Sequence, residues 1–254
     1  MGGTSGIGVA AARALIAEGV RVVCVGRDEA TAESARQDLG ERARVLTGDA
    51  CDPATADRAV REAVGFGGRL DGLFHVAGGS GRRAGDGPLH DLTDAGWNHT
   101  LRLNLESVFL SNRAAVRQFL EQGSGGAVLN LGSVLAQSPA PHFFATHAYA
   151  AAKAGLEGLT RAAAAHYAPE NIRFNAIAAG LVATPMSARA QSDDAIMRYT
   201  RTKQPLDDGR IGQPKDLLAA ILFFLSDASR FVTGQVLAVD GGWSVSEGQH
   251  GGPG

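Results

Sequence analysis

The sequence predicts an α/β fold in which helices cover both faces of a parallel β-sheet, giving three layers. Short apolar runs alternate with amphipathic or alanine-rich segments along most of the chain, and a glycine-rich loop precedes the first helical segment. No internal repeat or linker divides the 254 residues. We therefore expect a single domain over residues 1–246 and a flexible, glycine-rich tail over residues 247–254.

The individual elements follow from apolar periodicity and from the residues at their ends. Strand-length apolar runs predict β-strands at residues 20–25, 44–47, 70–76, 127–131, 172–177 and 235–239. Helical spacing predicts helices at residues 9–18, 29–39, 54–64, 94–122, 149–166 and 215–225, the last of them beginning next to Pro214. This alternation is typical of βαβ units, whose strands run parallel.

The composition argues against several classes of protein. A net charge of −2 provides no basic surface for nucleic acid or for an anionic membrane. Two cysteines, Cys24 and Cys51, do not form a disulfide framework and indicate a reducing compartment, so we expect a cytoplasmic protein. The seven histidines show no metal-ligand spacing, and no segment has the length and apolarity of a membrane span. We therefore expect no metal site and no membrane partner.

The loop at residues 2–8 reads Gly-Gly-Thr-Ser-Gly-Ile-Gly and leads directly into a helical segment. Glycines allow a tight turn and a close approach of the backbone to a pyrophosphate, and a helix N-terminus adds amide donors and partial positive charge. The spacing is a variant of the dinucleotide fingerprint, although an ordinary turn before a helix has the same composition. The cofactor-binding residues predicted here are Gly2, Thr4, Ser5, Gly6, Ile7 and Gly8.

A tyrosine and a lysine stand four positions apart at Tyr149 and Lys153, on what we expect to be one face of a helix. An ammonium group beside a phenol favours the phenolate, which lets the tyrosine exchange a proton with a substrate oxygen. Such a pair also occurs by chance on exposed helices. Its position downstream of a glycine loop gives it weight.

These motifs resemble the short-chain dehydrogenase/reductase family in its classical, single-domain type. The resemblance spans nearly the whole chain and includes Asn104 within Leu-Arg-Leu-Asn-Leu and Ser133 at the end of Leu-Asn-Leu-Gly-Ser. It continues through Ile-Arg-Phe-Asn-Ala-Ile at 172–177, Thr-Pro-Met at 184–186 and Val-Asp-Gly-Gly at 239–242. The resemblance implies a Rossmann-like, doubly wound sheet and NAD(P)-dependent interconversion of a ketone and a secondary alcohol.

The resemblance also implies a role for each residue. Tyr149 would be the general acid or base, and Lys153 would lower its pKa and bind the nicotinamide ribose. Ser133 would polarise the substrate oxygen, and Asn104 would hold a water molecule in a proton relay. Homodimers or homotetramers are usual in the family. Further cofactor contacts would come from Asp49, Ala50, Ala77, Gly78, Val182 and Thr184, in addition to Tyr149 and Lys153.

The choice of cofactor depends on the end of the strand at residues 20–25. A carboxylate there would bind a ribose 2′-hydroxyl and repel a 2′-phosphate. This chain has Gly26 and Arg27 instead, and arginine suits a phosphate. We therefore favour NADP over NAD, although Asp28 follows directly and Arg27 alone is also consistent with a solvated loop charge.

Three departures from the family pattern affect this interpretation. The chain starts at the glycine loop, without the strand that precedes it in the family, so we expect a true start further upstream. His75-Val76 replaces an Asn-Asn pair, and we expect His75 to have a structural role. Ala179-Gly180 stands where Pro-Gly is common.

Substrate specificity is expected on loops beyond the carboxyl ends of the strands, at residues 79–92, 134–147 and 181–210. The first loop carries Arg82 and Arg83, which either meet an anionic group or form a solvated pair. The predicted substrate is a small carbonyl or alcohol compound. The alternatives are a non-redox lyase, an oligomeric scaffold, and a cofactor-binding regulatory protein with little or no turnover.

Overall fold

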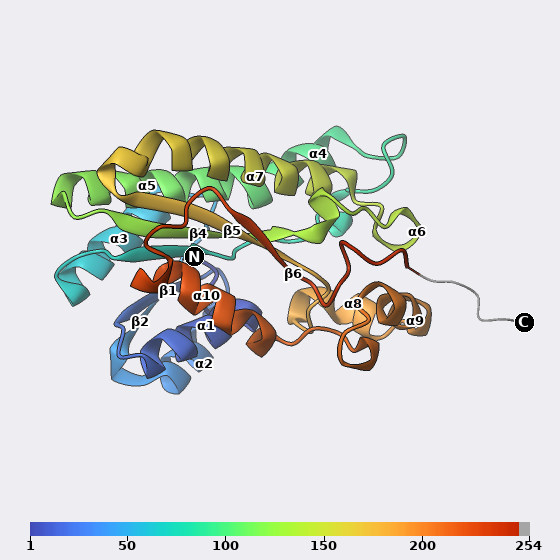
Figure 1. The fold of residues 1–254 in the computed structure, drawn as a ribbon, viewed down its shortest axis with the longest axis horizontal. Helices are drawn as coiled ribbons and strands as arrows, with labels where there is room; N and C mark the ends of the chain where they lie inside the picture. The colour runs from blue at the N-terminus through green and yellow to red at the C-terminus, as the bar shows by residue number, and fades with distance from the viewer. Residues whose placement is uncertain (249–254) are drawn as a thin grey trace, which may run out of the picture.

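The computed structural model describes residues 1–248 and has three layers, with a parallel sheet between two layers of helices (Figure 1). The α/β, doubly wound architecture predicted from the sequence is confirmed. The last six residues of the predicted tail lie outside the described part of the chain. The strands are β1 (Val22–Gly26), β2 (Ala43–Thr47), β3 (Gly72–His75), β4 (Gly126–Ser133), β5 (Ile172–Ala179) and β6 (Val236–Val239).

The helices form where the sequence provides both an apolar face and a start signal. Asp28 caps α2 by accepting a hydrogen bond from the Thr31 amide, and Asp52 caps α3 just before a proline. The helices are α1 (Gly6–Ala17), α2 (Glu29–Leu39), α3 (Pro53–Gly67), α4 (Asp94–Leu101), α5 (Ser107–Gln122), α6 (Pro141–Phe144), α7 (His147–Tyr167), α8 (Ala188–Gln191), α9 (Asp194–Lys203) and α10 (Leu218–Leu225).

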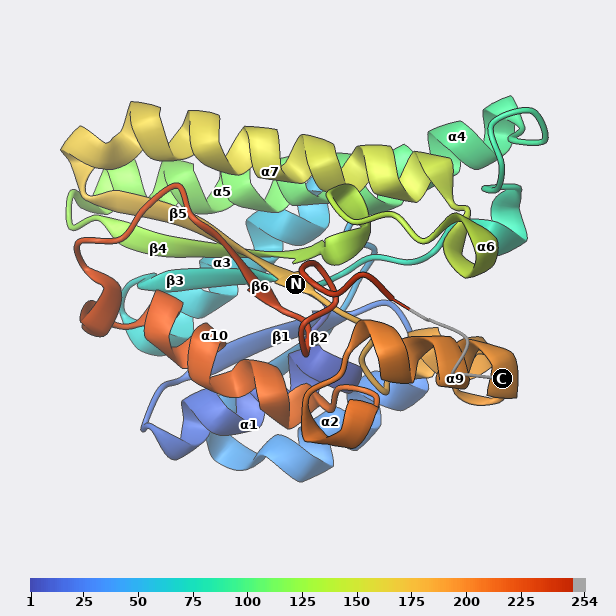
Figure 2. The same cartoon turned by 45° about the vertical axis from the view of Figure 1, so that its right-hand side comes forward.

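The strands pair only in parallel, as β1 with β2 and as β3-β4-β5-β6. Helices α5 and α7 pack on one face of β4 and β5, and α10 packs on the other face beside α1 (Figure 2). Leu129, Ile177 and Phe174 of the central strands are fully buried. The carboxyl ends of the strands meet at one edge of the sheet, where ligands bind in folds of this type.

A cavity of about 520 Å³ separates β1 from β3, and apolar side chains of both strands line it. Near the carboxyl ends of β1 and β3, the main chain of Met1 crosses this gap. Its amino group donates to the Phe74 carbonyl oxygen at 2.8 Å, and its carbonyl oxygen accepts from the Val76 and Ala77 amides. The next residue, Gly2, donates to the Val25 carbonyl oxygen at 2.8 Å. No strand among residues 1–248 lies between β1 and β3.

The segment predicted as one helix over residues 94–122 is divided in the structure. A π-helical turn, Arg102–Glu106, separates α4 from α5 and contains Asn104. The wider turn interrupts the regular hydrogen-bond ladder, and such turns are frequent at functional sites. Apolar periodicity cannot reveal it, because the residues on either side keep a helical pattern. The short helices α6, α8 and α9 lie in segments that we expected to be loops.

Candidate active site

Three of the predicted catalytic residues come together at the carboxyl end of β4 and the beginning of α7. Ser133 is the last residue of β4, and Tyr149 and Lys153 lie one turn apart near the start of α7. All three are buried, and the Ser133 hydroxyl accepts a hydrogen bond from the Leu135 amide at 3.3 Å. The Lys153 ammonium lies 5.6 Å from the centre of the Tyr149 ring and donates to the Leu131 carbonyl oxygen at 2.8 Å. The fold thus brings two hydroxyl-bearing side chains and one ammonium group to the same edge of the sheet.

Burial shifts the pKa values of Tyr149 and Lys153. It raises the pKa of Tyr149, and the hydrogen bond with Ser133 opposes this rise. It also lowers the pKa of Lys153 from 10.5 to about 8. The sequence led us to expect a tyrosine pKa lowered by the lysine, and the structure differs. Lys153 directs its ammonium to a main-chain carbonyl oxygen, and desolvation raises the pKa of Tyr149 more than the Ser133 hydroxyl lowers it.

The start of α7 is held by a carboxylate that sequence reasoning missed. Asp86 is buried, and its two oxygens accept hydrogen bonds from the amides of Ala148 and Tyr149, both at 3.0 Å. A negative charge at a helix N-terminus is favourable, because the first amides have no helical acceptor. Asp86 lies within a Gly-Asp-Gly stretch of the first predicted specificity loop. This Gly-Asp-Gly pattern is the only feature of the sequence that singles out Asp86.

Asn104 projects from the π-helical turn toward the loop after β3. Its amide oxygen accepts from the Gly79 amide at 3.0 Å, and its amide nitrogen donates to the carbonyl oxygens of Gly79 and Thr100, both at 2.9 Å. A Cβ atom on Gly78 would lie 2.7 Å from the Asn104 oxygen and 3.7 Å from the Lys153 ammonium. The π-helical turn therefore places Asn104 beside Gly78 and near Lys153. In this arrangement Asn104 braces the loop, and its role in a water relay stays a prediction.

His75 is fully buried at the end of β3, and its two ring nitrogens contact protein atoms. One nitrogen lies 2.7 Å from the Ser111 hydroxyl, and the other lies 3.2 Å from the Ala77 carbonyl oxygen and 3.3 Å from the Ser107 hydroxyl. Burial, then the nearby N-terminus and Lys153, lowers its pKa well below the usual range, so the ring is neutral. These contacts tie β3 to α5, and they support the structural role expected for His75.

The glycine loop makes a tight turn between Met1 and α1. Gly2 has a φ of +83°, and a Cβ atom on it would lie 2.6 Å from the Ala77 amide nitrogen. A Cβ atom on Gly8 would lie 1.9 Å from the Gly2 carbonyl oxygen. No side chain caps α1, and its first turn carries no acidic residue. The loop thus leaves helix-terminal amides available for an anion, which is the chemistry that a pyrophosphate requires.

The remaining predicted cofactor residues surround this loop. A Cβ atom on Gly6 would touch the Thr184 methyl group at 3.2 Å, which places Thr184 beside the start of α1. Val182 is buried and forms a parallel β-bridge with Gly212. Ala50 packs in the same apolar cluster as Met1 and Val25, while Ala77 borders that cluster. Sequence positions far apart in the chain therefore meet at one edge of the sheet.

The end of β1 is crowded against the glycine loop. A Cβ atom on Gly26 would lie 2.0 Å from the Thr4 hydroxyl oxygen, so only glycine fits there. The next residue, Arg27, is exposed and has no hydrogen-bond or ion-pair partner within residues 1–248. Asp49 follows β2; it is exposed, and its carboxylate accepts from the Cys51 amide at 2.9 Å.

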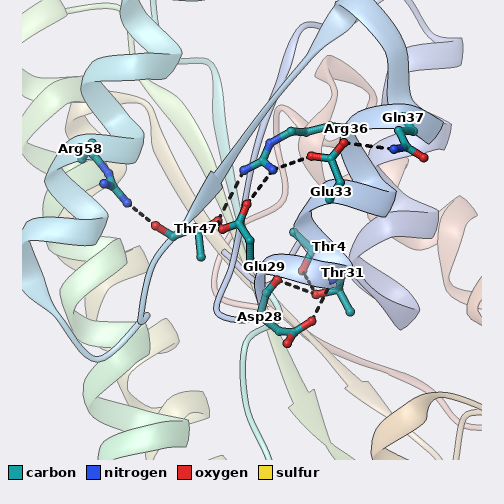
Figure 3. A network of polar contacts seen from close by, with 9 residues as sticks. All are labelled: Thr4, Asp28, Glu29, Thr31, Glu33, Arg36, Gln37, Thr47 and Arg58. Carbon is teal, nitrogen blue, oxygen red and sulfur yellow. Dashed lines mark hydrogen bonds and ion pairs between the residues drawn. The ribbon is translucent and has the colours of Figure 1, made fainter.

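The two acidic residues that follow Arg27 form polar contacts with side chains and amides of α2 and with the end of β2 (Figure 3). The Asp28 carboxylate accepts from the Thr31 amide at 2.8 Å. Glu29 pairs with Arg36 at 2.8 Å and accepts from the Thr47 hydroxyl at the end of β2. This network ties α2 to β2 and occupies both carboxylates that follow Arg27.

The three predicted specificity loops meet close to α7. Phe143 of the second loop lies 5.1 Å from Tyr199 of the third, measured between ring centres. Phe144 and Tyr199 each lie 5.8 Å from Trp243, whose indole nitrogen donates to the Ser138 carbonyl oxygen at 3.2 Å. These rings form an aromatic wall beside Val134, the residue after Ser133. Arg189, which sequence reasoning also missed, enters this region from the third loop.

Residues 1–248 contain neither a cluster of metal ligands nor a membrane-spanning helix. No group of three or more histidine, cysteine, aspartate or glutamate side chains there is arranged to hold a metal ion. No helix there combines the length and apolarity required to cross a membrane. Both cysteines are free and buried.

Comparison with known proteins finds relatives that align with nearly the whole chain. Residues 2–244 match the family model described as Enoyl-(Acyl carrier protein) reductase. The chain is 37% identical over 246 residues to cis-4-hydroxycyclohexanecarboxylate dehydrogenase from Sinomonas cyclohexanicum, covering 96% of this chain and 94% of that protein. It is 35% identical over 248 residues to galactitol 2-dehydrogenase (L-tagatose-forming) from Cereibacter sphaeroides, covering 96% and 93% of the two chains.

The fold is also similar to that of a solved enzyme with its cofactor. The structure of 3-ketoacyl-(acyl-carrier-protein) reductase from Brucella melitensis, complexed with NADH, superposes with a TM-score of 0.84 at 28% identity and covers 96% of both chains. The family model, the relatives and the fold agree with the motifs found in the sequence. The chain therefore belongs to the short-chain dehydrogenase/reductase family of oxidoreductases.

Proposed function

We propose that this protein is an NAD(P)-dependent oxidoreductase that interconverts a ketone and a secondary alcohol. The observation that carries the proposal is the joint burial of Ser133, Tyr149 and Lys153 at the edge of the sheet where the glycine loop begins α1. The relatives named above are a dehydrogenase of a hydroxy acid and a dehydrogenase of a polyol. A regulatory protein without turnover is not favoured, because this chain retains every proposed catalytic side chain.

The residues present fit a nicotinamide dinucleotide. The uncapped amides at the start of α1 suit the pyrophosphate, and Gly2 and Gly8 sit where a side chain would collide with the backbone. Asp49 and Ala50 would lie at the adenine edge, with Ala77 and Gly78 along the adjoining strand end. Val182 and Thr184 would lie at the nicotinamide end, and Lys153 would bind the ribose. When bound, the nicotinamide supplies or accepts a hydride.

The residues of this chain would handle the proton and the developing charge on oxygen. Ser133 would donate a hydrogen bond to the substrate oxygen and hold it next to Tyr149. Tyr149 would give its phenolic proton to that oxygen during ketone reduction, or accept a proton during alcohol oxidation. Its raised pKa suits the donor role, because the phenol stays protonated until the oxygen becomes basic. Lys153 would stabilise the phenolate that remains.

We further propose that NADP is preferred to NAD. Arg27 follows β1 directly, is exposed, and has no partner in the described part of the chain. The neighbouring carboxylates of Asp28 and Glu29 are held by a helix cap and an ion pair. Because the N–H donors of this arginine are free and the adjacent carboxylates are already hydrogen-bonded, the site favours a cofactor with a 2′-phosphate over one with a 2′-hydroxyl. The test is the ratio of kcat/KM with the two cofactors, and a higher value with NAD would contradict this preference.

A cytoplasmic location and a homodimer or homotetramer remain part of the proposal. The free state of both buried cysteines agrees with a reducing compartment. Size-exclusion chromatography with light scattering would determine the oligomeric state.

The test of the proposed function is a spectrophotometric assay of nicotinamide reduction with a panel of secondary alcohols, including cis-4-hydroxycyclohexanecarboxylate and galactitol. Tyr149→Phe is expected to abolish turnover and to keep cofactor affinity within about threefold, because the phenol acts on the substrate oxygen. Tyr167→Phe is the matched control, since Tyr167 packs on Phe174 at the far end of α7. Undiminished turnover in Tyr149→Phe would overturn the proposed mechanism.

A further inference from the structure

Two arginine side chains from different loops converge on one main-chain oxygen next to the aromatic wall. Arg82 donates to the Phe143 carbonyl oxygen at 2.9 Å, and Arg189 donates to the same oxygen at 3.3 Å. These residues belong to the three loops in which the sequence placed substrate specificity. Each guanidinium has five N–H donors, and one carbonyl oxygen cannot satisfy both groups.

The two positive charges have no ionic partner within residues 1–248. Neither arginine forms an ion pair there. The nearby acid, Asp86, gives both of its oxygens to the amides of Ala148 and Tyr149. Burial, and then the charge of Arg189, lowers the pKa of Arg82, while Asp86 partly opposes this. The cluster is therefore a concentration of unbalanced positive charge, which an anion would stabilise.

The position of the cluster links it to the reaction site. Phe143 lies in α6, six residues before Tyr149, and Asp86 joins the loop of Arg82 to the first turn of α7. The neighbouring Arg83 is exposed, and its side chain forms no hydrogen bond or ion pair within residues 1–248. The sequence could not distinguish these two arginines, and the structure does.

We propose that Arg82 and Arg189 form a subsite for a carboxylate of the substrate, and that the preferred substrates are hydroxy acids or keto acids with an apolar body. A carboxylate accepts two parallel hydrogen bonds from a guanidinium, a geometry that an ammonium does not offer. Phe143, Phe144 and Tyr199 would cover the apolar body beside it. The inference rests on the proposed function for the reacting oxygen, but the anion site itself does not require turnover.

The first experiment measures binding without chemistry. Benzoate and benzamide have the same ring and nearly the same size, but only benzoate is charged and neither carries an alcohol. Isothermal titration calorimetry with saturating NADP⁺, which occupies the pyrophosphate site, is expected to give benzoate at least tenfold higher affinity than benzamide. Arg82→Gln and Arg189→Gln each keep a hydrogen-bond donor and remove the charge. Both are expected to reduce this preference at least fivefold, and the matched control Arg83→Gln is expected to retain it.

The second experiment uses turnover. For cis-4-hydroxycyclohexanecarboxylate and its uncharged amide, Arg189→Gln is expected to raise KM for the acid at least tenfold, with little change for the amide. The Arg189 side chain is exposed, so this variant is expected to fold even if Arg82→Gln is less stable. Circular dichroism and thermal unfolding identify a folding defect.

The outcomes separate this proposal from the proposed function. Selective benzoate binding that depends on Arg82 and Arg189 supports the subsite even if none of the alcohols is oxidised, which would remove the proposed function alone. Equal affinities for benzoate and benzamide, or equal losses in Arg83→Gln and Arg189→Gln, would overturn the subsite and leave the oxidoreductase proposal intact. The subsite would also be overturned if the ratio of KM for the acid to KM for the amide were the same in both variants as in the wild type.

Discussion

The carboxylate of Asp86 anchors the helix that carries Tyr149 through the Tyr149 main-chain amide, 3.0 Å away. A second bond to the Ala148 amide uses the other carboxylate oxygen. The proposed general acid is thus held at its backbone from a loop 63 residues earlier in the chain. Because the bond is made by the main chain, the phenol remains free to face Ser133.

We expect Asp86→Ala to destabilise the protein by about 1–3 kcal/mol, because two buried amides and a helix N-terminus lose their acceptor. The same substitution should lower kcat more than it raises the cofactor KM, since it displaces the start of α7. Urea denaturation and initial rates measure the two effects. Asp91→Ala is the control, because Asp91 is exposed and its side chain pairs with the exposed His90 at the surface. Equal stabilities of the two variants would contradict the anchoring role.

The buried ammonium of Lys153 predicts a pH dependence of stability. Its pKa falls from 10.5 to about 8 on folding, so between these values the unfolded state binds more protons. The free energy of unfolding should therefore rise as pH increases from 8 toward 10.5, by roughly 3 kcal/mol at most for this group. Below pH 8 the penalty is fully present. Urea denaturation from pH 7 to 10 should show this slope.

Comparison with variants isolates the contribution of Lys153. In Lys153→Met the slope assigned to this group should disappear, whereas Lys215→Met, at an exposed position, should keep it. A slope that is identical in the wild type and in Lys153→Met would show that the ammonium is not desolvated as the structure indicates.

The close contact inside the glycine loop predicts the effect of one added methyl group. Gly8→Ala places Cβ 1.9 Å from the Gly2 carbonyl oxygen, so the loop must move. We expect at least tenfold weaker dinucleotide binding, measured by fluorescence titration of NADPH. Gly65→Ala is the matched control within α3, where a Cβ meets no atom within 4 Å. Because alanine has a higher helix propensity than glycine, Gly65→Ala should leave the free energy of unfolding unchanged or raise it by up to about 1 kcal/mol.

The cavity between β1 and β3 predicts that an added strand stabilises the fold. An extension of five valine and isoleucine residues before Met1 would line up with both open strand edges and displace a buried amino group, whose pKa burial lowers to about 6. The buried side chains contribute about 1.5–3 kcal/mol each, and ordering five residues offsets much of this. We expect a net gain of a few kcal/mol in urea denaturation. An extension of five serines should give none, and equal effects of both would exclude strand insertion.

The catalytic candidates were predictable from the sequence because their patterns are local. Tyr149 and Lys153 are one helical turn apart, and helical periodicity alone places them on one face. Gly2, Gly6 and Gly8 lie within seven consecutive residues at the start of α1, where spacing and residue type indicate an anion-binding turn. The parallel direction of the strands follows from the alternation of elements, because parallel strands need helical crossovers.

Other parts of the site depended on contacts between residues far apart in the chain. Neither the π-helical turn at Asn104 nor the raised pKa of Tyr149 has a local signal, because both result from packing. Arg82 and Arg83 are indistinguishable as neighbours in the sequence, and only the fold directs one of them to Phe143 beside Arg189. The sequence by itself determined which chemical groups the protein carries and on which elements. Only the tertiary structure decided which charges are buried and which remain unbalanced, because desolvation and Coulomb interactions depend on distance in space.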